Sequence, residues 1–161
     1  MSPGTFLRRA VLDDVPALAA LEAACFTHPW TPAQVREEVA RDPPDMVLVV
    51  EGPGSPGGAP AGIRAYGSFR LVLDEMHVMN VAVDPGFRRH GLARRLLAFA
   101  MARAARAGAR RALLELRAGN REALALYESL GFERLGLRRG YYGEPTEDAL
   151  VLARELCGPE S

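Results

Sequence analysis

One stretch of the sequence, residues 80–97 (NVAVDPGFRRHGLARRLL), joins a strand-like apolar run to a helix-like segment through a turn. The first turn of a helix carries unpaired backbone N–H groups and about half a unit of positive charge, so it attracts phosphate. Small residues at Gly91 and Ala93 let a diphosphate approach the backbone closely. Arg89 and Arg94 add cationic side chains at its rim. These residue types at this spacing predict a site for a phosphorylated ligand.

The turn is also compatible with sites and structures other than this phosphate site. The chain holds no GxxxxGK[ST] sequence and no GxGxxG sequence after a strand, which excludes two better-known phosphate loops. A single glycine is also compatible with an ordinary strand–turn–helix connection that binds nothing. The neighbouring arginines and the preceding VAV run favour the phosphate site.

The distribution of charge agrees with an anionic ligand. The chain has 20 basic residues, all of them arginine, 20 acidic residues and zero formal net charge. Between Arg88 and Arg111 there are eight arginines and no acidic residue, a local excess that suits a phosphorylated cofactor or a nucleic acid. A solvated helix face explains it equally well. The run has no recognition motif or interleaved aromatic residues, so we do not expect nucleic-acid binding.

Length and composition are those of one globular domain. Of the 161 residues, 48% are apolar and 25% charged, a balance typical of folded chains. No apolar run reaches the ~18 residues of a membrane span, and the N-terminus lacks a signal pattern, so we expect a cytoplasmic protein. Cys25 and Cys157 are far apart and have no activating neighbours, which argues against a disulfide framework, a zinc cluster or a thiol nucleophile. We expect a single domain over residues 1–161, with its core at about 5–156 and no metal.

The elements that must position the turn alternate between strand and helix patterns. Strands are expected at residues 5–9, 46–51, 63–72, 75–83, 112–117, 132–138 and 148–156. Helices are expected from an Asp13/Asp14 cap to residue 24, after the Thr31 cap with Pro32 first, at 92–107 before Gly108, and at 120–130. This order predicts a mixed α/β fold in which helices flank a largely antiparallel sheet.

Two segments carry more specific expectations. The unbroken run at 78–83 predicts a strand buried on both faces. Residues 52–60 (GPGSPGGAP) predict a flexible loop that connects two strands as a long hairpin.

The turn resembles the signature of the GNAT superfamily of N-acetyltransferases, [RQ]-x-x-G-x-[GA] after the fourth strand. The match is residues 88–93, with Ala93 where glycine is more usual. The resemblance implies a single-domain GNAT-like fold and acetyl-CoA as acetyl donor. It implies that the backbone of the last strand residues bonds the pantetheine arm: Val81, Ala82 and Val83. It also implies that the turn and helix start hold the pyrophosphate: Arg89, His90, Gly91, Leu92, Ala93 and Arg94.

Further segments are similar to the ribosomal-protein-alanine N-acetyltransferase branch of that superfamily. They are LLELRAGNREALALYESLGF at 113–132, FTHPW at 26–30, RGYY at 139–142 and EDA at 147–149. This resemblance covers nearly the whole chain. It implies direct ternary-complex transfer of acetyl to the N-terminal alanine of a small-subunit ribosomal protein. Gly119 departs from the serine common in the branch, and residues 52–60 look like an insertion, so neither supports a substrate inference.

The resemblance also implies roles for three residues, with Glu115 as general base, Tyr127 as general acid and Asn120 bonding the cofactor. A carboxylate can take a proton from an amine, directly or through water. Tyrosine, with a reference pKa of ~10, is still protonated at neutral pH and can serve a departing thiolate. Without that context, a strand-end glutamate usually faces solvent and a helical tyrosine usually packs.

Other residues are alternatives. Glu75 is a rival base, because some members of the superfamily use a glutamate on the fourth strand, although its place at the strand start also suits a solvated edge. His77 could relay a proton. Trp30, Tyr141 and Tyr142 could line the acceptor groove, and core packing explains Trp30 equally well.

The ordinary pKa values of amines bear on the acceptor. An α-amino group has a pKa near 7.7–8.0 and lysine near 10.4, so neutralising lysine at neutral pH costs ~3.5 kcal/mol more. An α-amine therefore suits a single carboxylate base. Acetylation of a small-molecule amine, or a non-catalytic role as an acyl-CoA sensor, is the alternative.

Overall fold

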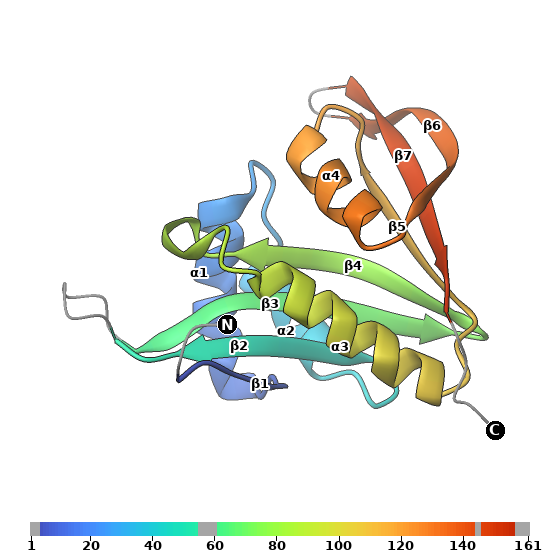
Figure 1. Cartoon of the computed structure of the whole chain (residues 1–161). Helices are drawn as coiled ribbons and strands as arrows, with labels where there is room; N and C mark the ends of the chain where they lie inside the picture. Colours follow the sequence, from blue (N-terminus) through green and yellow to red (C-terminus); the bar gives the residue numbers. More distant parts are fainter. Residues whose placement is uncertain (1–3, 55–60, 144–145, 157–161) are drawn as a thin grey trace. The chain divides into compact units, whose positions relative to one another are not determined.

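The computed structural model describes residues 4–54, 61–143 and 146–156, and its elements follow the expected order (Figure 1). The strands are β1 (Phe6–Arg9), β2 (Met46–Gly52), β3 (Gly62–Val72), β4 (Glu75–Val83), β5 (Arg111–Arg117), β6 (Glu133–Gly143) and β7 (Thr146–Glu155). The helices are α1 (Val15–Cys25), α2 (Pro32–Val39), α3 (Leu92–Arg106) and α4 (Arg121–Ser129). Short 3-10 turns at Leu12–Asp14 and Pro85–Phe87 complete the elements of the described residues.

Hydrogen bonds link the strands in the order β1-β2-β3-β4-β5-β7-β6. The pairs β1–β2, β2–β3, β5–β7 and β6–β7 are antiparallel, and β4–β5 is parallel. The mixed α/β fold with a largely antiparallel sheet is therefore confirmed.

Two compact units make up the chain. The first comprises Met1–Arg70 and Met79–Ala100, and the second comprises Leu71–Val78 and Met101–Ser161. The prediction of a single domain over residues 1–161 stays a prediction. The pairing of Gly52 with Gly62 across β2 and β3 confirms that residues 52–60 connect two paired strands. Residues 55–60 of that connection lie outside the described residues.

In the first unit, helices pack on both faces of β2 and β3. Figure 1 shows α1 and α2 behind these strands and the start of α3 in front of them. The core on the side of α1 and α2 is formed by buried side chains of five elements and of the link after β1: Ala10, Val15, Leu18, Leu21, Val35, Val47, Val49, Tyr66 and Ala82. Full burial of one such aliphatic side chain contributes about 1.5–3 kcal/mol. The end of β4 is therefore anchored to α1 through a common core.

The apolar run at 78–83 in β4 is not buried on both faces, so that prediction was wrong. Ala82 is 3% exposed and packs in the core with α1, whereas Met79 is 38% exposed. Val81 and Val83 are half-buried. Successive strand residues point to opposite faces, so the odd-numbered face is the one left incompletely covered. The pattern at 78–83, in which Asn80 is the one polar residue, did not distinguish a covered face from an apolar face that stays partly open.

The starts of the first two helices differ from each other. Thr31 Oγ1 accepts the Gln34 N–H at 3.1 Å and Gln34 Oε1 accepts the Thr31 N–H at 2.8 Å, which confirms the predicted cap. Asp14 takes the predicted N-cap position of α1, but its side chain makes no capping bond to that helix. Its carboxylate accepts two N–H groups of Arg8 at 2.8 and 2.9 Å and the Val11 N–H at 2.8 Å. A bidentate Arg–carboxylate pair makes two charge-assisted bonds, whereas a cap makes one.

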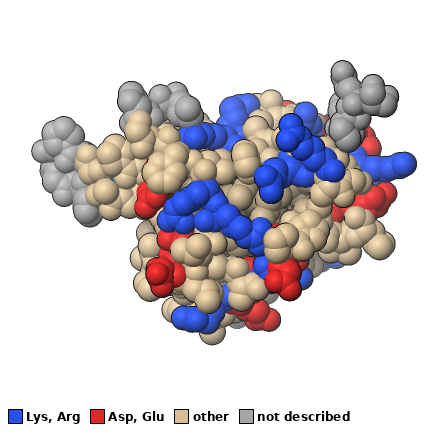
Figure 2. Space-filling view, turned by 90° about the horizontal axis from the view of Figure 1, so that it is seen from below, with Lys and Arg blue, Asp and Glu red and all other residues tan. Residues whose placement is uncertain are grey.

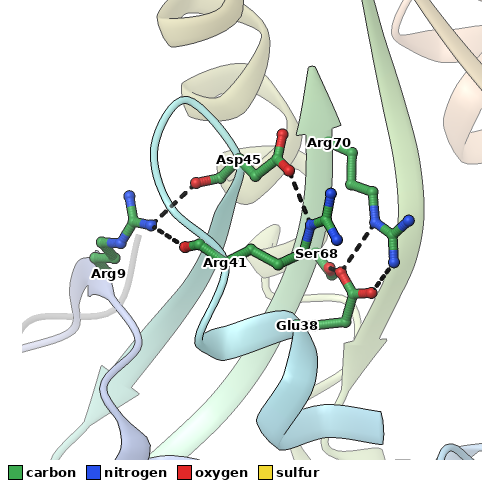
Figure 3. Close-up of polar contacts among 6 residues, drawn as sticks. All are labelled: Arg9, Glu38, Arg41, Asp45, Ser68 and Arg70. Carbon is green, nitrogen blue, oxygen red and sulfur yellow. Dashed lines mark hydrogen bonds and ion pairs between the residues drawn. The ribbon is translucent and has the colours of Figure 1, made fainter. Parts of the chain in front are cut away.

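The connection from α2 to β2 is held by the polar contacts of Figure 3. Buried Glu38 accepts the Ser68 hydroxyl at 3.2 Å and pairs with the Arg70 guanidinium. Arg9 donates to the carbonyl oxygens of Arg41 and Asp45 at 3.1 and 3.0 Å. These contacts tie the end of α2 to β3 and the loop after α2 to β1.

In the second unit, β7 lies between β5 and β6 and is antiparallel to both. Ala112, Leu114 and Leu116 of β5 are buried, so the odd-numbered residues of this strand, including Glu115, face the other side. The register of β6 shifts between Arg138 and Tyr142. The predicted strand at 132–138 therefore continues through an irregular section to Gly143.

Candidate functional site

The turn after β4 has a backbone shape suited to an anion. Asp84 Oδ1 accepts the Gly86 N–H at 2.9 Å, and Arg89 and Gly91 adopt left-handed φ angles of 67° and 76°. Such conformations, set between right-handed or extended residues, turn neighbouring N–H groups toward one side. Because α3 begins at Leu92, the first N–H groups of that helix have no acceptor inside it. The strand–turn–helix geometry is confirmed, and phosphate binding there stays a prediction.

The side chains of the turn leave room for a ligand group. Arg89, His90 and Gly91 are exposed. A Cβ placed on Gly91 would meet no heavy atom within 4 Å. Leu92 is 4% exposed, so its side chain anchors α3 and only its backbone is suited to ligand binding. Together these features fit a diphosphate.

Ala93 and Arg94 extend the turn into the first turn of α3. Ala93 is half-buried and Arg94 is exposed. The guanidinium of Arg64 lies 4.2 Å above the ring of Phe87, and the rings of Phe87 and His90 are 6.3 Å apart. These ring contacts stabilise the turn between β4 and α3, while the Arg89 and Arg94 side chains are exposed.

The last residues of β4 present part of their backbone for hydrogen bonding. The Asp84 N–H donates to Arg64 O in β3 at 2.8 Å, so the Val83 N–H points to the opposite edge, as consecutive amides do. The Val83 carbonyl accepts from Cys25 Sγ at 3.2 Å and Arg88 Nε at 3.4 Å. A ligand along this strand would therefore use the N–H of Val83 rather than its carbonyl.

The arginine-rich stretch is not a continuous basic surface. Arg95 donates to Thr5 Oγ1 at 3.2 Å and Arg111 donates to Glu75 at 2.7 Å, so members of the stretch make separate local contacts. In Figure 2 both arginine and acidic side chains occur across the displayed face. Part of the local excess of arginine is therefore offset by nearby polar and acidic side chains.

Glu115, the expected base, lies on the odd-numbered face of β5 with two polar partners. Arg138 approaches its carboxylate at 3.3 Å, and the Tyr141 hydroxyl hydrogen-bonds to it, which raises the pKa of Tyr141. The guanidinium of Arg138 also lies 5.5 Å from the Tyr141 ring centroid. The sequence proposed Tyr141 as a groove residue and did not identify Arg138. The structure thus brings Glu115, Tyr141 and Arg138 together.

Tyr127, the expected acid, lies in α4 in a different environment. Its side chain is 9% exposed and its ring packs edge-on against Phe132 at 5.6 Å. Burial raises the pKa of Tyr127 to about 12. Glu115 is therefore held by polar partners, whereas Tyr127 is held by apolar packing.

Asn120 caps α4, since its Oδ1 accepts the Ala123 N–H at 3.1 Å. Its expected contact with a cofactor stays a prediction. The preceding loop is held by Glu147, whose carboxylate accepts the Gly119 N–H at 2.7 Å and lies 3.4 Å from Arg117. A Cβ on residue 119 would lie 2.7 Å from the Glu147 carboxylate. Glycine at this position therefore matches the close approach of Glu147.

Glu75, the rival base, is engaged in an ion pair. Arg111 donates to its carboxylate at 3.2 and 2.7 Å, and His77 lies 3.4 Å away. Arg111 lowers the pKa of Glu75. Because β4 and β5 pair at Glu75 and Arg111, this pair stabilises the strand register, a structural role that suits it better than proton transfer.

Sequence reasoning missed Glu22, a carboxylate in α1 that is 1% exposed. It accepts the Trp30 N–H at 2.8 Å, the Tyr66 hydroxyl at 2.6 Å and the Asn80 amide at 2.6 Å. Burial raises the pKa of Glu22. Helical spacing places Glu22 on the same face of α1 as the buried Leu18. An acidic residue on that apolar face was the signal in the sequence that could have identified a buried carboxylate.

The remaining candidates are placed as follows. Trp30 is half-buried and packs against the first unit's core, and Tyr142 lies under the Arg117 guanidinium at 4.2 Å. Cys157 lies outside the described residues. Within residues 4–54, 61–143 and 146–156, no group of three His, Cys, Asp or Glu side chains could hold a metal ion. No helix in those same ranges is long and apolar enough to cross a membrane.

Known proteins resemble the chain over most of its length. A sequence model described as Acetyltransferase (GNAT) family matches residues 15–132. The [Ribosomal protein bS18]-alanine N-acetyltransferase of Escherichia coli strain K12 is 34% identical over 144 residues, covering 87% of this chain and 90% of that protein. The N-alpha-acetyltransferase RimI of Mycobacterium tuberculosis is 38% identical over 148 residues, covering 91% and 89%. The crystal structure of the ribosomal-protein-S18-alanine N-acetyltransferase from Escherichia coli matches with a TM-score of 0.82 and 29% identity, covering 98% and 97%.

Proposed function

The chain belongs to the GNAT acetyltransferase family and is an N-acetyltransferase, and from this premise we propose its donor, acceptor and catalytic residues. The donor is acetyl-CoA, which supplies the acetyl group as a thioester. The acceptor is the N-terminal α-amine of a protein, an alanine of a ribosomal protein. Transfer is direct, in a ternary complex of enzyme, donor and acceptor.

The turn after β4 supports the donor. Left-handed Arg89 and Gly91 and the first turn of α3 supply backbone N–H groups for the pyrophosphate. The N–H groups on the outer edge of β4, at Val81 and Val83, suit the amides of the pantetheine arm. The half-buried apolar face of the same strand suits its methylene groups.

Glu115 is the proposed general base. An α-amine with a pKa near 7.7–8.0 is already partly neutral at physiological pH, so a carboxylate that receives one proton through water is sufficient. The Tyr141 hydroxyl and Arg138 support this role, because both fix the orientation of the carboxylate on β5.

Tyr127 is the proposed partner of the departing thiolate. Its pKa of about 12 keeps the hydroxyl protonated at any physiological pH. A thiol has an ordinary pKa of ~8.5. The Tyr127 phenol is therefore the weaker acid by ~3.5 pKa units, and complete transfer of its proton to a thiolate is unfavourable. Physical chemistry therefore favours hydrogen-bond donation to the developing negative charge, followed by protonation of the thiolate from water.

The observation that carries the acceptor proposal is the near full-length likeness to relatives named for alanine N-acetylation of a ribosomal protein and for Nα-acetylation. A ribosomal acceptor implies a cytoplasmic location, which we also propose. We further propose one catalytic domain over residues 1–161, because the family match at 15–132 includes parts of both compact units.

An acceptor panel tests the proposal. Purified protein is mixed with acetyl-CoA and three versions of one peptide: a free N-terminal alanine, a blocked terminus with an internal lysine, and both groups blocked. Thiol release should be fast only with the free alanine, and Glu115→Gln should reduce that rate by about 100-fold. Faster turnover of a polyamine or aminoglycoside than of any alanine peptide would assign the enzyme to small-molecule acetylation instead.

A further inference from the structure

The buried carboxylate of Glu22 joins three separate parts of the first unit. Its Oε1 accepts the backbone N–H of Trp30, which precedes α2. Its Oε2 accepts the hydroxyl of Tyr66 in β3 and the amide of Asn80 in β4. Three donors converge on one side chain that is 1% exposed. A buried charged acceptor holds its donors more strongly than a neutral acceptor does.

The elements that Glu22 joins meet beside the strand proposed to hold the donor. Asn80 is followed by Val81 and Val83 in β4, whose amides we assigned to the pantetheine arm. At the end of α1, the Cys25 thiol donates to the Val83 carbonyl at 3.2 Å. The segment at residues 26–30 therefore starts beside the end of β4 and returns to Glu22 at Trp30.

We propose that Glu22 is a positioning residue that sets the 26–30 segment against β4, and thereby fixes the acceptor amine relative to the thioester. The inference rests on the proposed function, in which the thioester arm lies along β4. The bond to Trp30 goes to a backbone N–H, so it fixes the path of the segment whatever side chains it carries. The bond to Asn80 fixes the strand to the same carboxylate. Glu22 touches neither substrate in this role.

The chain supplies both a reporter and a matched control. Trp30 is the sole tryptophan, so its fluorescence reports the segment directly. Glu38 is a second buried carboxylate of the same unit, 9% exposed, and it bonds Ser68 and Arg70 instead (Figure 3). Its contacts lie on α2 and β3. Removing the Glu38 carboxylate should lower the stability of the first unit without changing the position of the 26–30 segment.

Three variants separate positioning from general destabilisation. Glu22→Met fills the same volume but breaks all three bonds. Glu22→Gln retains an acceptor oxygen for the Trp30 N–H. The NH₂ group of the new glutamine can donate to the amide oxygen of Asn80 once the Asn80 amide rotates. Glu38→Met is the control for loss of a buried carboxylate. Each protein is measured for acrylamide quenching of Trp30, for coenzyme A affinity and for KM and kcat with the alanine peptide.

Glu22→Met should increase the quenching constant of Trp30 and raise the peptide KM by about tenfold, the effect of losing one hydrogen bond to a charged group. The kcat at saturating peptide should change much less. Glu22→Gln should restore both readouts to within about threefold of the wild type, since one acceptor remains. Glu38→Met should lower thermal stability with no change in quenching or peptide KM.

Wild-type quenching and peptide KM in Glu22→Met would overturn the inference, and so would equal changes in Glu38→Met. Should Glu22→Met fail to fold, Glu22→Asp replaces it, because the shorter side chain withdraws the carboxylate from Trp30 by about one C–C bond, ~1.5 Å. The quenching measurement needs no turnover. An inactive wild-type enzyme would therefore contradict the proposed function, while the quenching of Trp30 would still decide the role of Glu22.

Discussion

Two described residues other than glycine have left-handed backbones, Arg89 with φ 67° and Leu73 with φ 56°. Arg89 lies in the turn proposed to hold the pyrophosphate. Leu73 lies between β3 and β4 and is 96% exposed. The two residues therefore share a strained conformation but differ in their relation to the proposed site. Replacing each with glycine separates stability from ligand binding.

The structure sets the size of the expected stabilisation. A left-handed conformation costs an L-residue about 1–2 kcal/mol. Glycine avoids this cost but loses about 0.5–1 kcal/mol more conformational entropy on folding. Arg89→Gly should therefore stabilise the protein by about 0.5–1 kcal/mol and raise Tm by about 1–4 °C for a chain of this length.

The same substitution should weaken coenzyme A binding. A hydrogen bond to a charged group contributes about 1.5–3 kcal/mol, and Arg89 is exposed, so the lower end applies. Kd for coenzyme A should rise by about tenfold in low salt. The difference should shrink as salt screens the exposed charge.

Calorimetry with and without coenzyme A measures both effects. Leu73→Gly is the control, because it should raise Tm by a similar amount and leave the affinity unchanged. A lower Tm in Arg89→Gly alongside a higher Tm in Leu73→Gly would show that the Arg89 side chain stabilises the turn. An unchanged Kd in Arg89→Gly would refute the assignment of this side chain to the phosphate site.

Three further predictions concern titrating groups. Tyr127→Phe should lower kcat by about 100-fold with unchanged coenzyme A affinity, because it removes the hydrogen-bond donor to the thiolate; because burial raises the pKa of Tyr127 to about 12, wild-type rates measured up to about pH 10 should show no loss from its ionisation. Glu115→Gln should lower the pKa values of Tyr141 and Tyr142, since the Glu115 carboxylate raises both; phenolate absorbance should show earlier titration, and the change should become smaller when Tyr141→Phe is added. Arg8 holds the pKa of Asp14 below its usual range, so the stabilisation is present above pH ~4 and lost as pH falls through the lower folded value. Urea unfolding should therefore show Asp14→Asn to be less stable than wild type at neutral pH, and a gap that does not close in acid would contradict this pairing.

The sequence by itself determined the features that depend on neighbours within a few residues. The cap at Thr31, the turn from Arg88 to Ala93 and the start of α3 follow from side-chain and backbone preferences that act within one helical turn. The element order follows from hydrophobic periodicity, which each segment carries independently. Asp14 takes the N-cap position of α1 as expected, but its carboxylate bonds Arg8 rather than the N–H groups of the helix.

Only the tertiary structure decided which polar groups meet. Glu22 takes partners that are 8, 44 and 58 residues away in sequence. Glu115 meets Arg138 and Tyr141 because β7 lies between β5 and β6 and the register of β6 shifts beside Arg138. Strand order and register select these contacts from many that composition would allow, since a carboxylate has no sequence-local preference among distant donors. At Glu22, which is 1% exposed, burial then makes the selected bonds strong, because a charge removed from water must be satisfied by the groups the fold places around it.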